Sequence, residues 1–115
     1  MDCAHRVDLV HKAITLGNIE WKPKALEIML DAEEMKGFTD RGVRFLLQDF
    51  VKQGGQVKPR FEKRSEYIDP DHPYWYRAVI PVPEFPKGLF VETLLLDHEE
   101  EADPFLQIVS AHRQH

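Results

Sequence analysis

Apolar residues recur every three or four positions in the first half of the chain, which is the spacing of one buried helix face. The first such set comprises Ala4, Val7, Val10 and Ile14. This set predicts a helix over residues 3–16 that ends at Gly17. A second helix is predicted to begin around Trp21, with Pro23 in its first turn, and to end at Gly37.

The most regular helical pattern follows Thr39, a residue type that often caps the start of a helix. Phe38 lies just before it and is placed to form a hydrophobic staple with Val43. The apolar stripe of this helix comprises Val43, Leu46, Leu47, Phe50 and Val51. Gly54-Gly55 ends the pattern, so helices are expected over about residues 3–54.

From Gln56 onward the period of the pattern changes to two, which is the period of β-strands. Every second residue from 58 to 66 is charged, with Lys63 as a further charge between them, and β-rich or apolar runs follow at 74–80, 89–96 and 105–111. Connections of about five to eight residues favour antiparallel hairpins. Pro59 places the first strand at the edge of the sheet or delays its start.

The order of these elements predicts the fold class. We expect a single α+β domain over residues 1–115, with N-terminal helices packed on one face of a four-stranded antiparallel sheet at about residues 56–113. The residues expected in its core include Leu46, Leu47, Phe50, Val91, Leu95, Ile108 and Val109.

The composition fits a globular protein, since 43% of the 115 residues are hydrophobic and 30% are charged, which argues against disorder. Cys3 is the only cysteine and cannot form an internal disulfide. No apolar run approaches the roughly 20 residues that a membrane-spanning helix needs, and the first residues lack the apolar core of a secretory signal. We therefore expect a cytoplasmic protein with no membrane association.

The charge is unevenly distributed along the chain. The net charge is -5, which argues mildly against a general nucleic-acid binder. Residues 41–64 nevertheless hold seven basic and two acidic side chains. The stretch therefore carries a local charge of +5 in an otherwise acidic chain, and the sequence leaves open whether it forms one surface patch.

Most sequence signatures of chemistry are missing. There is no glycine motif that would cradle a phosphate, no paired-cysteine zinc site and no HExxH motif. The acidic stretch at residues 97–103 has the residue types of a hard-cation site, but a solvated hairpin loop is the simpler interpretation. We therefore expect no metal and no cofactor.

The basic residues of the predicted strands form a more coherent group. Lys58, Arg60, Glu62 and Arg64 share one face of the first strand, and Arg77 lies on the next strand with Tyr74 and Tyr76 nearby. On a shared surface the arginines would bind phosphate, the aromatic rings would stack on bases, and Glu62 or His112 would transfer protons. Among the six histidines, His112 is the best candidate because it ends a rigid strand. The simpler interpretation is an ordinary solvated strand face.

The overall pattern resembles the RelE–barnase–colicin superfamily of small ribonuclease toxins and the uncharacterised domains grouped near them. The segments that carry this resemblance are KALEIMLDAEEMKGFTDRGVRFLLQDFVKQGGQV, KPRFEKRSEY, YWYRAVIPV, LFVETLLLD and FLQIVSAHRQ. The resemblance implies metal-independent RNA cleavage by sheet-borne Lys, Arg, Tyr, His or Glu, with neutralisation by an antitoxin. The acidic net charge departs from these toxins, which are usually basic.

A binding or regulatory domain without catalysis is the competing interpretation, and we favour it because no specific catalytic motif is present. Tyr74, Trp75 and Phe85 flank proline-rich turns, and aromatic residues are favoured in the cores of protein interfaces. These three residues predict an interface with a second copy or with another protein. The sequence leaves open whether the partner is a protein or RNA.

Overall fold

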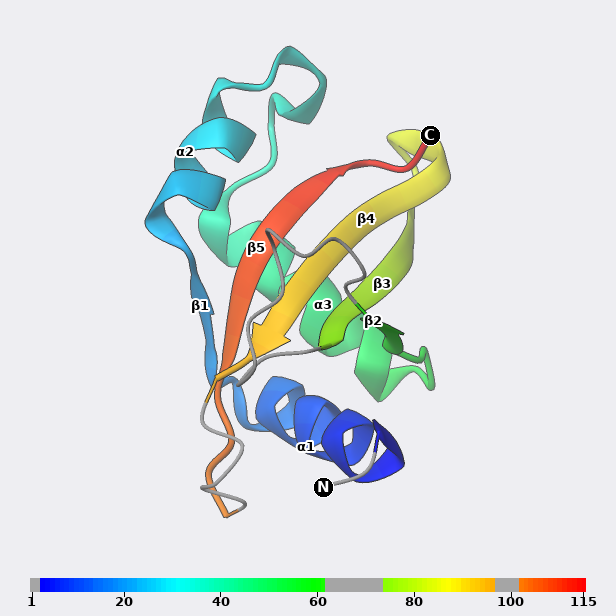
Figure 1. Cartoon of the computed structure of the whole chain (residues 1–115). Helices are drawn as coiled ribbons and strands as arrows, with labels where there is room; N and C mark the ends of the chain where they lie inside the picture. The colour runs from blue at the N-terminus through cyan, green and yellow to red at the C-terminus, as the bar shows by residue number, and fades with distance from the viewer. Residues whose placement is uncertain (1–2, 62–73, 97–101) are drawn as a thin grey trace.

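The computed structural model describes residues 3–61, 74–96 and 102–115, and its elements follow one another from an N-terminal helical half to a C-terminal sheet (Figure 1). The helices are α1 (Cys3–Leu16), α2 (Pro23–Asp31), the short 3-10 helix η1 (Glu33–Met35) and α3 (Asp40–Lys52). The strands are β1 (Ile19–Trp21), β2 (Lys58–Phe61), β3 (Tyr74–Val82), β4 (Phe85–Leu95) and β5 (Leu106–Arg113).

The sheet has five strands in the order β1-β5-β4-β3-β2. β2 to β5 pair with their chain neighbours in antiparallel fashion, as predicted, but β1 joins the sheet parallel to β5. The prediction of four antiparallel strands is therefore wrong by this one strand. β1 has only three residues, too few to show a two-residue period beside the helix signal of Pro23.

The core lies between the sheet and the helices. α3 crosses behind the strands and α1 lies across their lower end, while α2 lies beside β5 beyond the end of β1 (Figure 1). The helices bury Val10, Ile14, Met29, Val43 and Leu47 against the strand residues Leu89, Val91, Leu106 and Ile108.

The predicted core is confirmed for Leu47, Val91, Leu95 and Ile108, whereas Leu46 and Phe50 pack on its margin. Val109 is half-buried, which corrects its prediction. The pairing of β4 with β5 shifts register between Glu92 and Thr93, and Val109 is the extra residue on β5. Val109 directly follows the core residue Ile108, and adjacent strand residues point to opposite faces, so both cannot lie in the core row. The bulge shifts the alternation after Val109, so that Ala111 lies in the core opposite Val91.

The second helix is shorter than its pattern predicts. α2 ends at Asp31, because Ala32 has an extended backbone (φ -73°, ψ 122°), and η1 follows as a separate turn. The apolar spacing continues through Met35, which is fully buried, so the periodicity reports burial and not an unbroken helix.

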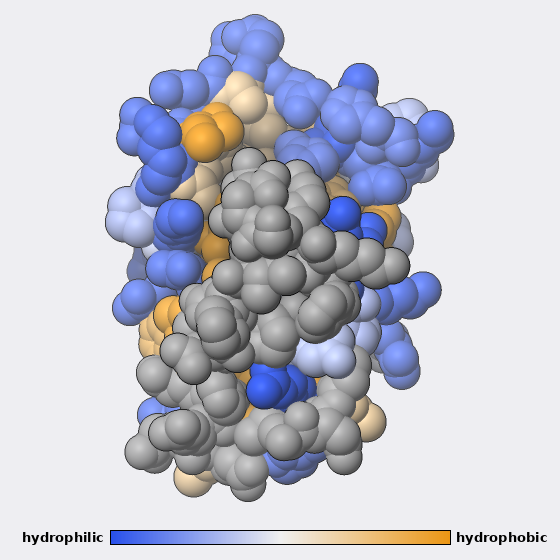
Figure 2. Space-filling view, in the orientation of Figure 1, coloured by the Kyte–Doolittle hydropathy of each residue, from blue (hydrophilic) through white to orange (hydrophobic). Residues whose placement is uncertain are grey.

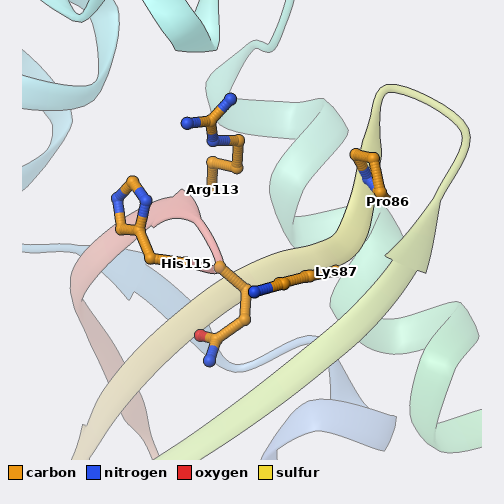
Figure 3. Close-up of a pocket in the computed structure, with 5 residues that line it drawn as sticks. Pro86, Lys87, Arg113 and His115 are labelled. Atoms are coloured by element: carbon orange, nitrogen blue, oxygen red, sulfur yellow. The ribbon is translucent and has the colours of Figure 1, made fainter.

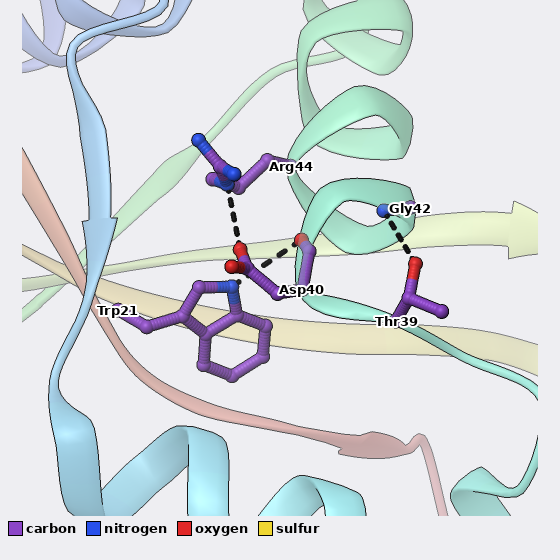
Figure 4. Close-up of polar contacts among 5 residues, drawn as sticks. All are labelled: Trp21, Thr39, Asp40, Gly42 and Arg44. Atoms are coloured by element: carbon purple, nitrogen blue, oxygen red, sulfur yellow. Dashed lines mark hydrogen bonds and ion pairs between the residues drawn. The ribbon is translucent and has the colours of Figure 1, made fainter.

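The start of α3 is fixed by local polar contacts (Figure 4). The side chain of Thr39 accepts a hydrogen bond from the backbone N–H of Gly42 at 2.9 Å, which confirms it as the N-cap. The Trp21 indole Nε1–H of β1 donates to the backbone carbonyl of Asp40 at 3.4 Å, and Arg44 Nε donates to Asp40 Oδ1 at 2.7 Å. The hydrogen bond from Trp21 to Asp40 therefore connects β1 to the start of α3.

Around the margin of the sheet the described surface is mostly hydrophilic, with an apolar patch over α2 (Figure 2). The exposed large apolar side chains of α2 are Ile28 and Leu30, and Phe45 of α3 is 64% exposed. No helix in the described part of the chain is both long and apolar enough to cross a membrane.

Replacing Leu47 with alanine tests the core of this fold. We expect Leu47→Ala to lower the free energy of unfolding by roughly 2–5 kcal/mol, because the side chain is 1% exposed and its loss leaves a cavity. Phe45→Ala on the exposed side of the same helix should change it by less than about 0.5 kcal/mol. Urea titration measures both values, and equal losses for the two variants would contradict the described packing.

Candidate nucleic-acid interface

The face of the sheet opposite α1 and α3, here called the open face because neither of these helices packs on it, is determined by strand alternation. On β3, Tyr76, Ala78 and Ile80 are buried toward the helices, so Trp75 and Arg77 point to the other side. Cross-strand register extends this assignment to the neighbouring strands. The open face comprises Lys58, Arg60, Trp75, Arg77, Val79, Phe90, Glu92, Leu94, Gln107, Ser110 and His112.

One end of the open face is basic and aromatic. Lys58 of β2 lies directly opposite Arg77 of β3, and Arg60 lies opposite Trp75. The two β2 side chains are exposed, and the two β3 side chains are partly exposed. We call these four residues the basic patch. Adjacent strands lie about 4.8 Å apart, so the four side chains can contact one ligand.

A carboxylate that the sequence analysis did not single out lies beside the basic patch. Glu92 of β4 is the cross-strand neighbour of Arg77 on one side and of Ser110 on the other. It is 4% exposed, although it belongs to the open face. The signal that could have revealed it is a single acidic residue within the apolar run of residues 89–96.

His112 lies in the next row of the open face, opposite Phe90. Its ring stacks between those of Phe90, 4.8 Å away, and His115, 5.9 Å away. His112 Nδ1 is 2.8 Å from the carbonyl oxygen of Arg113. Because a carbonyl can only accept, we assign Nδ1 as the donor in this contact, and in the tautomer with its proton on Nδ1 the Nε2 atom is an acceptor.

The register brings some of the predicted site residues together and separates others. Arg60 and His112 are three strands and four residues apart, which places their backbones about 20 Å from each other. Arg77 and His112 are closer, about 12 Å apart by the same geometry. The open face therefore gathers the arginines in one patch but does not bring Arg60 and His112 to the same phosphate.

Several of the predicted aromatic residues do not lie on the open face. Tyr76 is 1% exposed on the helix-facing side of β3, so the expectation that it stacks on bases is wrong. Phe85 is also buried, and it stacks on Phe38 with ring centroids 5.4 Å apart. Tyr74 is half-buried with the Arg6 guanidinium 5.9 Å above its ring. Among the predicted interface residues, Trp75 alone belongs to the open face.

Two further predictions fall outside the described residues. Glu62 and Arg64 lie between the described segments, as does most of the acidic stretch. Within the segments that are described, no three His, Cys, Asp or Glu side chains are grouped closely enough to hold a metal ion.

Comparisons of this chain with protein-family models, curated proteins and solved structures found no match. The resemblance to ribonuclease toxins therefore stays a prediction.

Proposed function

We propose that this protein is a non-catalytic binding domain that holds single-stranded RNA on the basic patch. The observation that carries the proposal is the pairing of Lys58 with Arg77 and of Arg60 with Trp75 across β2 and β3. Three cations beside a partly exposed indole match the needs of a single strand. Its phosphates pair with Lys and Arg, and base stacking on an aromatic ring contributes about 1–3 kcal/mol per base.

The acidic net charge is compatible with this proposal because five of the described acids lie towards the far edge of the sheet, although Glu92 lies beside Arg77. Glu20, Glu27, Asp31, Glu33 and Glu34 belong to β1, α2 and η1. β1 and β2 form opposite edges of the sheet, four strand spacings or about 19 Å apart. The Debye length at physiological salt is about 8 Å, so these carboxylates are largely screened from a phosphate at the basic patch.

Binding without catalysis is favoured by two features of the open face. Glu92 is 4% exposed, which leaves its carboxylate little access to a bound ribose. Arg60 and His112 lie about 20 Å apart, too far to act on one scissile phosphate. A basic surface that binds the RNA backbone without cleaving it needs neither an accessible Glu92 carboxylate nor His112 close to Arg60.

RNA is favoured over a homodimer because two of the three predicted interface rings do not belong to the open face. Phe85 packs in the core against Phe38, and Tyr74 is half-buried beside Arg6. Trp75 then stands among cations, whereas the centre of a protein interface is usually depleted of charge. A second copy or another protein partner is the alternative if RNA does not bind.

A metal-independent endoribonuclease is the second candidate function, and one arrangement favours it. Arg77, Glu92 and His112 belong to neighbouring rows of the open face, and Nε2 of His112 is an acceptor in the tautomer with its proton on Nδ1. A base, an acid and a phosphate-binding cation are the groups that attack by a ribose 2′-hydroxyl requires.

Charge removal at the basic patch tests RNA binding. With a fluorescein-labelled oligouridine of about ten nucleotides, Arg60→Gln and Arg77→Gln should each weaken binding. Each should also reduce the slope of log affinity against log salt by about 0.7, the value for one lost phosphate contact on a single strand. Fluorescence anisotropy at several salt concentrations measures both quantities.

The matched control is Arg41→Gln, which removes the same charge from an exposed position on α3 and should leave the salt slope unchanged. Equal weakening by all three variants would show that only net charge matters. No binding by the unmodified protein at low salt would sink the proposal and leave a protein partner.

Incubation of the protein with mixed RNA in EDTA separates the two candidate functions. Simple binding predicts intact RNA between about pH 5 and 8, the range in which histidine titrates. Cleavage that His112→Ala slows by about a hundredfold or more would instead establish the ribonuclease, because that is the usual size of a general acid or base contribution.

A further inference from the structure

A pocket of about 320 Å³ lies where β4 begins and β5 ends, outside the basic patch (Figure 3). Its lining comprises Pro86, Lys87, Arg113, Gln114 and His115. Three of these side chains can carry positive charge, and none is acidic. Such a pocket attracts an anion, and its volume is at the lower end of the range for small-ligand sites, about 300–1,000 Å³.

Backbone contacts hold the walls of this pocket in place. The N–H of Gln114 donates to the carbonyl of Gly88 at 3.0 Å, which fixes the residues after β5 against β4. Gly88 has a positive φ of 95°, and a Cβ there would approach the backbone oxygen of Ile80 to 2.9 Å, so the position favours glycine. His115 is further held by stacking on His112.

The cations around the pocket are only weakly engaged by the described residues. Arg113 Nε lies 3.8 Å from Glu34 Oε2, a long ion pair between two partly exposed groups. This contact leaves both Nη groups of the guanidinium available to a ligand, as far as residues 3–61, 74–96 and 102–115 show. Figure 3 shows Arg113 and His115 on β5 and its extension, with Lys87 on β4 beside them.

We propose that this pocket binds a phosphate monoester. A guanidinium presents paired donors that match phosphate oxygens, and a lysine adds a point charge to the same anion. The ring of His115 offers a stacking surface for an attached base, as histidine does in single-strand recognition. The ligand class is therefore a phosphate with at most one nucleoside in contact with the pocket.

Two sources could supply this group, a free mononucleotide and the terminal phosphate of a nucleic-acid strand. Arg113 is two strands and three residues from Arg77, so the pocket lies about 14 Å from the basic patch along the sheet. The proposal that the pocket binds a phosphate monoester does not depend on RNA binding. Only its assignment to a strand terminus rests on the proposed RNA binding.

Titration of the ¹⁵N-labelled full chain with inorganic phosphate and with adenosine monophosphate tests the site. Both should shift the backbone amides of Lys87, Gly88 and Gln114. Arg113→Gln and Lys87→Gln should each weaken binding roughly tenfold, as expected for the loss of one charged hydrogen bond. Lys24→Gln, at an exposed position on α2, is the matched control and should have no effect.

A second arm distinguishes the two sources with oligouridines that carry either a phosphate or a hydroxyl at each end. Tighter binding of a phosphorylated end, lost in Arg113→Gln but kept in Lys24→Gln, assigns the pocket to strand termini. Equal binding of both ends, with retained shifts from adenosine monophosphate, assigns it to a free nucleotide. Absence of amide shifts at tens of millimolar phosphate, or shifts that both pocket variants leave unchanged, would overturn the proposal. Failure of oligouridine binding alone would refute only the proposed RNA function.

Discussion

One-sided burial of β3 is the constraint on which the rest of the structure depends. Tyr76, Ala78 and Ile80 are buried between the sheet and the helices. The Thr93 hydroxyl of β4 donates to the Tyr76 carbonyl at 3.0 Å, which adds a polar contact between the two strands at this point. A slip of one residue would turn Arg77 into the core and Tyr76 out of it. The register that builds the core therefore also builds the basic patch.

The sequence predicted those elements for which the capping residue, the apolar spacing and the connection lengths all indicate the same structure. The N-cap of α3, its apolar stripe and the antiparallel pairing of β2 to β5 all follow from such signals. β1 was missed because three residues cannot show a period. The break at Ala32 was missed because buried side chains continue through it at helical spacing to Met35.

The candidate site was harder to predict because it depends on which face of each strand is buried. The run Tyr74-Trp75-Tyr76 places aromatic residues on both faces of the strand. Alternation alone therefore could not assign Tyr76 to the core and Trp75 to the open face. Lys58 and Arg60 were placed on a shared strand face, which the structure confirms through their partners Arg77 and Trp75. Glu92 became visible as a site residue only when register placed it beside Arg77.

The protein offers two cationic surfaces with different shapes, and they suit different parts of one kind of ligand. The basic patch is a stretch of sheet with two exposed and two partly exposed side chains, suited to the repeating phosphates of a strand. The pocket formed by Lys87, Arg113 and His115 is hollowed and limited in size, suited to a single phosphate. β4 and β5 connect the two surfaces, so the core that supports one also supports the other.

The two tryptophans provide the most direct test of the central claim. Trp75 is partly exposed in the basic patch, whereas Trp21 is 8% exposed and its indole N–H donates to the Asp40 carbonyl on the helix side. Titration of oligouridine into the ¹⁵N-labelled protein should move the Trp75 indole N–H resonance and leave that of Trp21 in place. Movement of Trp21 alone, or of neither resonance when anisotropy shows binding, would contradict the placement of RNA on the open face.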